Sequence, residues 1–187
     1  MQTAPAMPVI ALPPSRLYKA VTAEQIADYL IAFSNATGSL VSHMKLQKLI
    51  FYTQAWHIAV FNEPVFEEDF QAWIHGPVLP SLYERYKIFQ WRPIVRDDLD
   101  EASLHALEHS FSSSIQEILA DVIIEYFHKD AFALERSTHE EAPWRIARGP
   151  LAADEPSTNI ITKKTIHGYY SQFVKSDGQE FQPTKDE

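Results

Sequence analysis

The stretch from His43 to Phe61, HMKLQKLIFYTQAWHIAVF, decides which fold this sequence can adopt. Its apolar residues recur at spacings of three and four, which is the pattern of an amphipathic helix. Ser42 stands where an N-cap residue is expected, and Asn62 can adopt the left-handed conformation that ends a helix. We therefore predict a long helix whose core-facing side carries Leu46, Leu49, Ile50, Trp56 and Val60, with Lys45, Lys48 and Tyr52 on a neighbouring face.

Further helices are expected on both sides of this stretch. Thr22 and Gln25 have the spacing of a capping box, and Gly38 can end the helix that they begin. Residues 65–74 include an alternating pattern that suits a short strand. Apolar periodicity predicts other helices near residues 80–87, 101–111 and 114–128, and after Thr162. The expected fold is mainly α, a compact single-domain helical bundle with at most a short β-strand or hairpin near residues 65–75.

Both ends of the chain differ in composition from its middle. Residues 1–16 contain four prolines and are predicted to be a disordered N-terminal extension. Residues 175–187, KSDGQEFQPTKDE, are polar and are predicted to be a disordered tail. Between them, residues 17–174 are expected to form one helical domain, because this segment shows no internal repeat.

Composition and charge favour a cytoplasmic protein that binds another protein. The 16 basic and 25 acidic side chains give a net charge of −9, which would repel nucleic acid but suits a basic partner, including a basic toxin that acts on RNA. There is no cysteine, which excludes disulfides and thiolate chemistry. The proline-broken N-terminus has no positive region of the kind that begins a secretory signal, and no apolar run approaches membrane-spanning length.

Two clusters of titratable residues raise the question of metal binding or catalysis. Glu101, His105 and His109 follow one another along a predicted helix, but three ligands in consecutive turns cannot all point at one tetrahedral ion, so a solvated face is favoured. His139 and Glu140 could form an acid–base pair, and Thr138 and Glu141 have capping-box spacing. Because Pro143 would interrupt a helix begun there, a hydrogen-bonded turn that delivers Trp144 to the core is favoured.

The lysine pair on the long helix has two readings. Lys45 and Lys48, flanked by Tyr52, could grip a carboxylate or a phosphate. Such a pair is more often a solvated helix face with buried stems, and this reading is favoured here.

Two motifs carry a family resemblance. The segment from Met44 to Lys87, MKLQKLIFYTQAWHIAVFNEPVFEEDFQAWIHGPVLPSLYERYK, and the segment from Thr138 to Arg148, THEEAPWRIAR, resemble the Panacea antitoxin domain, also known as the SocA-like or phage-associated protein family. With the flanking helices the resemblance covers roughly residues 17–174. Asn62 departs from the pattern, since relatives commonly have glycine there, but asparagine preserves the turn.

The resemblance implies an antitoxin that is not an enzyme and needs no cofactor. It implies a cytosolic protein that neutralises a cognate toxin by direct binding. In the case that gave the SocA family its name, the antitoxin also delivers its toxin to the ClpXP protease. No direct nucleic-acid or membrane partner is expected.

The His-Gly-Pro sequence at 75–77 is expected to be mainly a structural corner. Gly76 should supply a backbone conformation or a close approach that a side chain would prevent, and Pro77 should fix the exit from the turn. His75 is expected to form a hydrogen bond across the turn. Around it, Trp73, Tyr83 and Tyr86 are expected to pack against Trp56 or Trp144.

These expectations divide the motif residues into two groups. The predicted partner-binding residues are Lys45, Lys48, Tyr52, His75, Tyr83 and His139. The predicted structural residues are Trp56, Trp73, Gly76, Pro77, Tyr86, Thr138, Glu141, Pro143 and Trp144. Two alternatives stay open: a small-ligand-binding protein or hydrolase with a pocket of His75, His139 and Glu140, and a phage or host protease adaptor that has no toxin.

Overall fold

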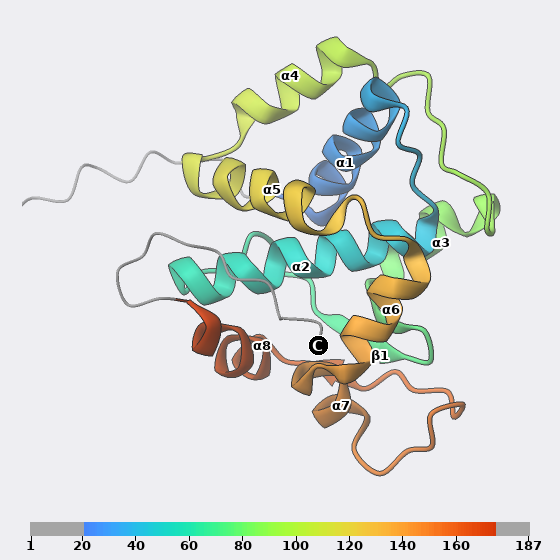
Figure 1. The fold of residues 1–187 in the computed structure, drawn as a ribbon, viewed down its shortest axis with the longest axis vertical. Coiled ribbons are helices and arrows are strands. Elements are labelled where there is room, and N and C mark those ends of the chain that lie inside the picture. The colour runs from blue at the N-terminus through green and yellow to red at the C-terminus, as the bar shows by residue number, and fades with distance from the viewer. Residues whose placement is uncertain (1–20, 175–187) are drawn as a thin grey trace, which may run out of the picture.

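One long helix, α2 (His43–Phe61), runs through the middle of the computed structural model, which describes residues 21–174 (Figure 1). The predicted caps are confirmed: the Ser42 hydroxyl accepts from the Lys45 amide, and Asn62 has a φ of 56°. The prediction of an amphipathic helix is wrong, because every residue from Leu46 to Ala59 is buried. A helix that is covered on all sides belongs to the centre of a domain rather than to its surface.

The other helices surround α2. They are α1 (Ala23–Thr37), α3 (Pro80–Tyr86), α4 (Glu101–Ser110), α5 (Ser113–Tyr126), α6 (Ala131–Glu140), α7 (Ala142–Arg148) and α8 (Lys163–Tyr170), with short 3-10 turns η1 (Lys87–Phe89) and η2 (Ser171–Phe173). The capping box of Thr22 and Gln25 is confirmed, and Gly38 ends α1 at a φ of 71°. In Figure 1, α1, α4 and α5 lie on one side of α2, while α7, α8 and β1 lie on the other.

A small sheet accompanies these helices. The strands β1 (Phe70–Trp73), β2 (Gly76–Val78) and β3 (Ile160–Ile161) are antiparallel in the order β2-β1-β3. The mainly α fold with one short hairpin is therefore confirmed, although the sequence did not predict β3. Pairing of Phe70 with Ile161 brings the loop before β3 back to the hairpin. This long-range pairing places residues 156–158 beside the candidate site.

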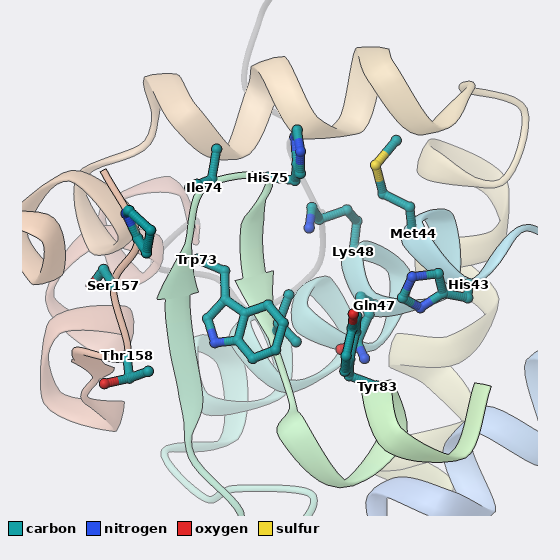
Figure 2. A pocket seen from close by; sticks show the side chains of 12 residues that line it. His43, Met44, Gln47, Lys48, Trp73, Ile74, His75, Tyr83, Ser157 and Thr158 are labelled. Carbon is teal, nitrogen blue, oxygen red and sulfur yellow. The ribbon is translucent and has the colours of Figure 1, made fainter. Parts of the chain in front are cut away.

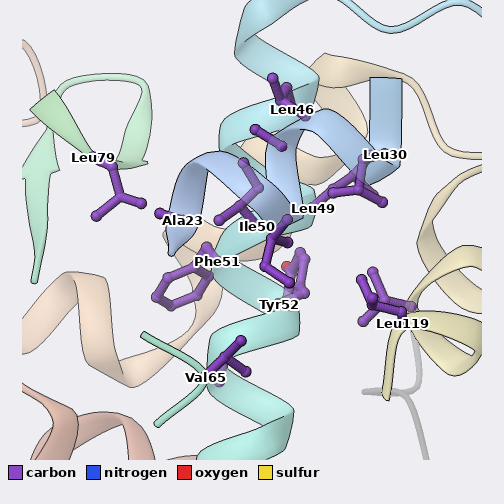
Figure 3. Packing of buried hydrophobic residues seen from close by; sticks show 14 of the residues in the cluster. Ala23, Leu30, Leu46, Leu49, Ile50, Phe51, Tyr52, Val65, Leu79 and Leu119 are labelled. Carbon is purple, nitrogen blue, oxygen red and sulfur yellow. The ribbon is translucent and has the colours of Figure 1, made fainter. Parts of the chain in front are cut away.

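Aromatic residues of α2 pack against α5. The ring of Tyr52 stacks on that of Tyr126 with centroids 4.0 Å apart, and the Trp56 indole donates to the Tyr126 hydroxyl at 3.0 Å. Figure 3 shows Phe51 and Tyr52 among the leucines and isoleucines that fill the core. Trp56 therefore packs in this core. The expectation that the corner residues pack against Trp56 or Trp144 is confirmed in part, by the contact of Trp73 with Trp144.

The segment from Thr138 to Trp144 joins α6 to α7 and differs from the predicted turn. Thr138 lies in the last turn of α6, where its hydroxyl donates to the Glu135 carbonyl, so it caps nothing. Pro143 stands in the first turn of α7, where a proline begins a helix rather than interrupting it. Trp144 is buried, as expected, and its indole donates to the Trp73 carbonyl at 2.9 Å.

Glu141 holds the α6–α7 junction from inside the core. It is 3% exposed, and its carboxyl accepts from the hydroxyls of Tyr52 at 3.0 Å and Tyr170 at 2.5 Å. Tyr52 is itself fully buried, so it serves this network and presents no surface to a partner.

The predicted extensions at residues 1–16 and 175–187 lie outside the described residues. Within the described range, the helices are all too short or too polar to cross a membrane.

Candidate partner-binding site

The corner at 75–77 is built around Gly76. Its φ is 96°, a conformation that residues with a side chain rarely adopt. A Cβ at this position would lie 2.7 Å from Cε of Lys48 and 2.8 Å from Oγ1 of Thr138. Both parts of the prediction for Gly76 are confirmed, the unusual backbone and the close approach. Through this contact the hairpin rests on α2 and α6 together.

A pocket of about 490 Å³ opens beside this corner (Figure 2). Its walls come from the first turns of α2, the β1–β2 hairpin, α3 and residues 156–158. Trp73 and Tyr83 form an edge-to-face pair with centroids 4.8 Å apart, and the ring of His43 lies 5.4 Å from that of Tyr83. The volume and the mainly apolar, aromatic lining are typical of a site that takes up a side chain or a small molecule.

Three of the predicted partner-binding residues meet at this pocket. Lys48, His75 and Tyr83 line it. His75 is exposed, but its Nδ1 contacts the Glu135 carboxylate on α6 at 2.8 Å, so the predicted bond across the turn is wrong. The favoured reading of Lys48 as a solvated residue is also wrong, because its side chain is fully buried.

The other three are placed elsewhere. The Lys45 ammonium donates to the Phe127 carbonyl at 2.6 Å, Tyr52 is in the core, and His139 stacks on Trp144 with centroids 4.0 Å apart. Tyr86 is buried, its hydroxyl donates to Asp28 at 3.3 Å, and its ring lies 6.4 Å from that of Phe89.

Lys48 is the unusual charge in this site. Among the described residues its ammonium has one hydrogen-bond acceptor, the Pro77 carbonyl at 3.1 Å. Burial lowers the pKa of Lys48 to about 7, and the Glu135 carboxylate only partly opposes this shift. Burial and the neighbouring Lys48 also lower the pKa of His43, whose Nδ1 is buried and has no hydrogen-bond partner in the described part of the chain.

Lys48→Met should stabilise the protein at low pH. The pKa of Lys48 is lower in the folded state than its ordinary value of 10.5, so the unfolded chain binds more protons between pH 7 and pH 10.5, and wild-type stability rises with pH in that window. We expect the variant to gain about 2 kcal/mol at pH 6 and much less at pH 9.5, measured by urea unfolding. Lys164→Met, at an exposed position of α8, is the control and should show no such difference.

Two residues that the sequence did not single out hold the pocket walls. The Gln47 amide accepts from the Leu79 N–H at 2.8 Å and donates to the Leu79 carbonyl at 3.2 Å, which fixes the end of the hairpin to α2. Arg148 is buried and donates to the carbonyls of Ala72, Ala152, Ala153 and Glu155. Arg148 ends the second motif, but its burial depends on contacts that sequence spacing does not reveal.

The alternative pocket of His75, His139 and Glu140 is not formed as predicted. Of the three, only His75 lines the pocket, and Glu140 is exposed on α6. In the other histidine cluster, His109 Nδ1 contacts the His105 carbonyl at 2.7 Å. The described residues contain no group of three or more histidine, aspartate or glutamate side chains placed to hold a metal ion.

The central buried helix, the hairpin corner and the aromatic pocket define a small helical domain with a site suited to binding. The chain belongs to the family described as the antitoxin SocA-like, Panacea domain, whose model matches residues 46–145. This match confirms the resemblance, supports a general antitoxin role and suggests a role that is not enzymatic. Neither the comparison with curated proteins nor the comparison with solved structures finds a match.

Proposed function

We propose that this protein neutralises a cognate protein toxin by binding it directly, with the pocket between α2, the hairpin and α3 at the centre of the contact. The family supports the antitoxin role. The observation that carries the location is the pairing of Trp73 with Tyr83, two aromatic side chains that remain only half-buried at the mouth of the pocket. Half-buried tyrosine and tryptophan in a concave site are the residues that most often dominate protein interfaces.

The charge of the chain supports a basic toxin. The 25 acidic side chains outnumber the 16 basic ones, so the two proteins would attract each other before contact. A cytoplasmic location, where such a toxin acts on the cell that makes it, is part of the proposal.

Co-expression tests the proposal. The open reading frame next to this gene is induced with and without this protein, and complexes are isolated through a tag on this chain. The proposal expects growth arrest without the protein, and rescue by a stoichiometric complex with it. A harmless neighbour that does not co-purify would remove the support for an antitoxin role.

Tyr83→Ala is expected to weaken the toxin complex at least about tenfold, because truncating a central aromatic residue commonly costs more than 1 kcal/mol of binding free energy. Isothermal titration with the purified toxin measures this, and thermal unfolding confirms that the variant folds. Trp91→Ala is the matched control, since Trp91 is 83% exposed and does not line the pocket. An effect of Trp91→Ala that exceeds that of Tyr83→Ala would place the interface elsewhere.

Delivery to ClpXP is the second part of the proposal, and it rests on the family alone. Purified ClpXP should degrade the toxin faster when this protein is present. Faster degradation of a protein that is not a toxin, with no growth arrest in co-expression, would instead favour the adaptor that has no toxin.

A further inference from the structure

The pocket contains a positive charge that a purely apolar anchor site would not need. The Lys48 side chain lies between His75 and Met44, and its ammonium has one carbonyl acceptor among the described residues (Figure 2). The nearby carboxylate of Glu135 is already in contact with Nδ1 of His75. A buried ammonium with so few partners is unfavourable for folding, so it favours any anion that can reach it.

A second polar atom points to the same chemistry. Nδ1 of His43 is buried and has no hydrogen-bond partner in residues 21–174. His43 precedes Lys48 by five residues on α2, and both line the pocket. A carboxylate has enough lone pairs to accept from a lysine and a histidine together. Most of the remaining wall, including Trp73, Ile74 and Val78, is apolar and suits the body of a side chain rather than a second charge.

We propose that the pocket binds a segment of the toxin in which a carboxylate lies next to an aromatic or aliphatic side chain, with Lys48 binding the carboxylate and Trp73 and Tyr83 holding the apolar side chain. This inference rests on the proposed function for its occupant. A carboxylate in the pocket is compatible with a toxin that is basic overall. The net charges of the two proteins act at long range, whereas Lys48 recognises one carboxylate at contact distance.

A small probe tests the chemistry without the toxin. We would titrate the full chain with 3-phenylpropionate, with its amide and with 3-phenylpropylamine, and follow the indole N–H signal of Trp73 by NMR. The carboxylate should bind at least about tenfold tighter than the amide, as expected for one charge-assisted hydrogen bond, and the amine should bind most weakly. Equal binding of the three probes would overturn the assignment of a carboxylate.

The variant Lys48→Met tests whether Lys48 causes the preference for the carboxylate, because it removes the charge and keeps a side chain of similar length. The variant should bind the carboxylate and the amide equally, and should still bind the amide as the wild type does. Lys164→Met is the control and should keep the preference for the carboxylate. A preference that survives in Lys48→Met would show that Lys48 does not bind the carboxylate.

The pH dependence gives a readout that a purely structural lysine would not produce. Because Lys48 loses its proton near pH 7 in the free protein, probe affinity should fall roughly tenfold between pH 7 and pH 8.5. The titratable groups around Lys48 are His43 on α2, His75 on the hairpin, Tyr83 on α3, and Glu135 and His139 on α6. A flat profile over this range would contradict the role of Lys48.

Competition identifies the occupant. Saturating 3-phenylpropionate should displace the toxin from the wild-type protein. If the probe binds through Lys48 but does not displace the toxin, the carboxylate site stands and the toxin is not its occupant. If no toxin is found in co-expression, probe binding still decides the chemistry of the pocket.

Discussion

We expect Glu141→Ala to lower the free energy of unfolding by about 4 kcal/mol, the largest effect of any single substitution considered. The wild-type carboxyl accepts from Tyr52 and Tyr170, which are both fully buried. Alanine would leave two buried hydroxyls without their acceptor, and would add a small cavity at the α6–α7 junction. Each unsatisfied buried group costs about 1–3 kcal/mol, and the lost packing adds to this.

Urea unfolding measures the effect, and the neighbouring residue supplies the control. Glu140 is exposed on the last turn of α6, so Glu140→Ala should change stability by less than about 0.5 kcal/mol. A Glu141→Ala protein as stable as the Glu140→Ala protein would contradict the role assigned to the buried network.

The same carboxyl should make stability depend on pH. Burial raises the pKa of Glu141 from 4.5 to about 8, although the tyrosine hydroxyls oppose the shift. The folded state therefore binds more protons than the unfolded state between pH 4.5 and pH 8. This contribution is complete below pH 4.5 and is lost as the pH rises through 8, at roughly 1 kcal/mol per pH unit. Glu141→Gln should abolish this slope.

Gly76→Ala should lower the free energy of unfolding by about 3 kcal/mol. The added methyl group would have to lie within 3 Å of both Lys48 and Thr138, on a backbone with a φ of 96°. Although a lysine end group is flexible, the Lys48 side chain is buried among neighbouring side chains, which limits how far it can shift. Thr138 is a branched side chain on α6 and has little freedom to move.

Gly38→Ala isolates the backbone part of this effect. Gly38 has a φ of 71°, but no atom lies within 4 Å of the position of an added Cβ. We expect this control to lose only about 1 kcal/mol, and the difference between the two variants measures the close contact at the corner. Equal losses in thermal or urea unfolding would show that the contact contributes nothing.

Local chemistry explains which parts of the fold the sequence predicts. Helix ends at Thr22, Gly38, Ser42 and Asn62 follow from short-range hydrogen bonds and backbone preferences, and all four are confirmed. The junction near Pro143 is different, because a proline can either interrupt a helix or begin one. In the structure, Glu141 is extended between α6 and α7, and its carboxyl is buried against Tyr52 of α2 and Tyr170 of α8. These long-range contacts cannot be predicted from local sequence.

The burial of polar residues explains why the sequence did not predict the positions of Lys48 and Tyr52. A lysine and a tyrosine on an amphipathic pattern are expected near the surface, yet Lys48 and Tyr52 are enclosed by elements that are distant in sequence. His75 and Tyr83, which were both predicted to bind a partner, do line one pocket. The wall at 156–158 could not be predicted, since it depends on the two-residue strand β3 pairing with β1.

Site-specific photo-crosslinking tests the central claim, that the toxin binds at this pocket, most directly. A photo-reactive amino acid would replace Thr158, which is exposed at the pocket, or Ile124, which is 75% exposed on α5. The account predicts a crosslink to the co-purified toxin from position 158 and none from position 124. A crosslink from position 124 alone would place the toxin on the opposite side of α2 and contradict the account.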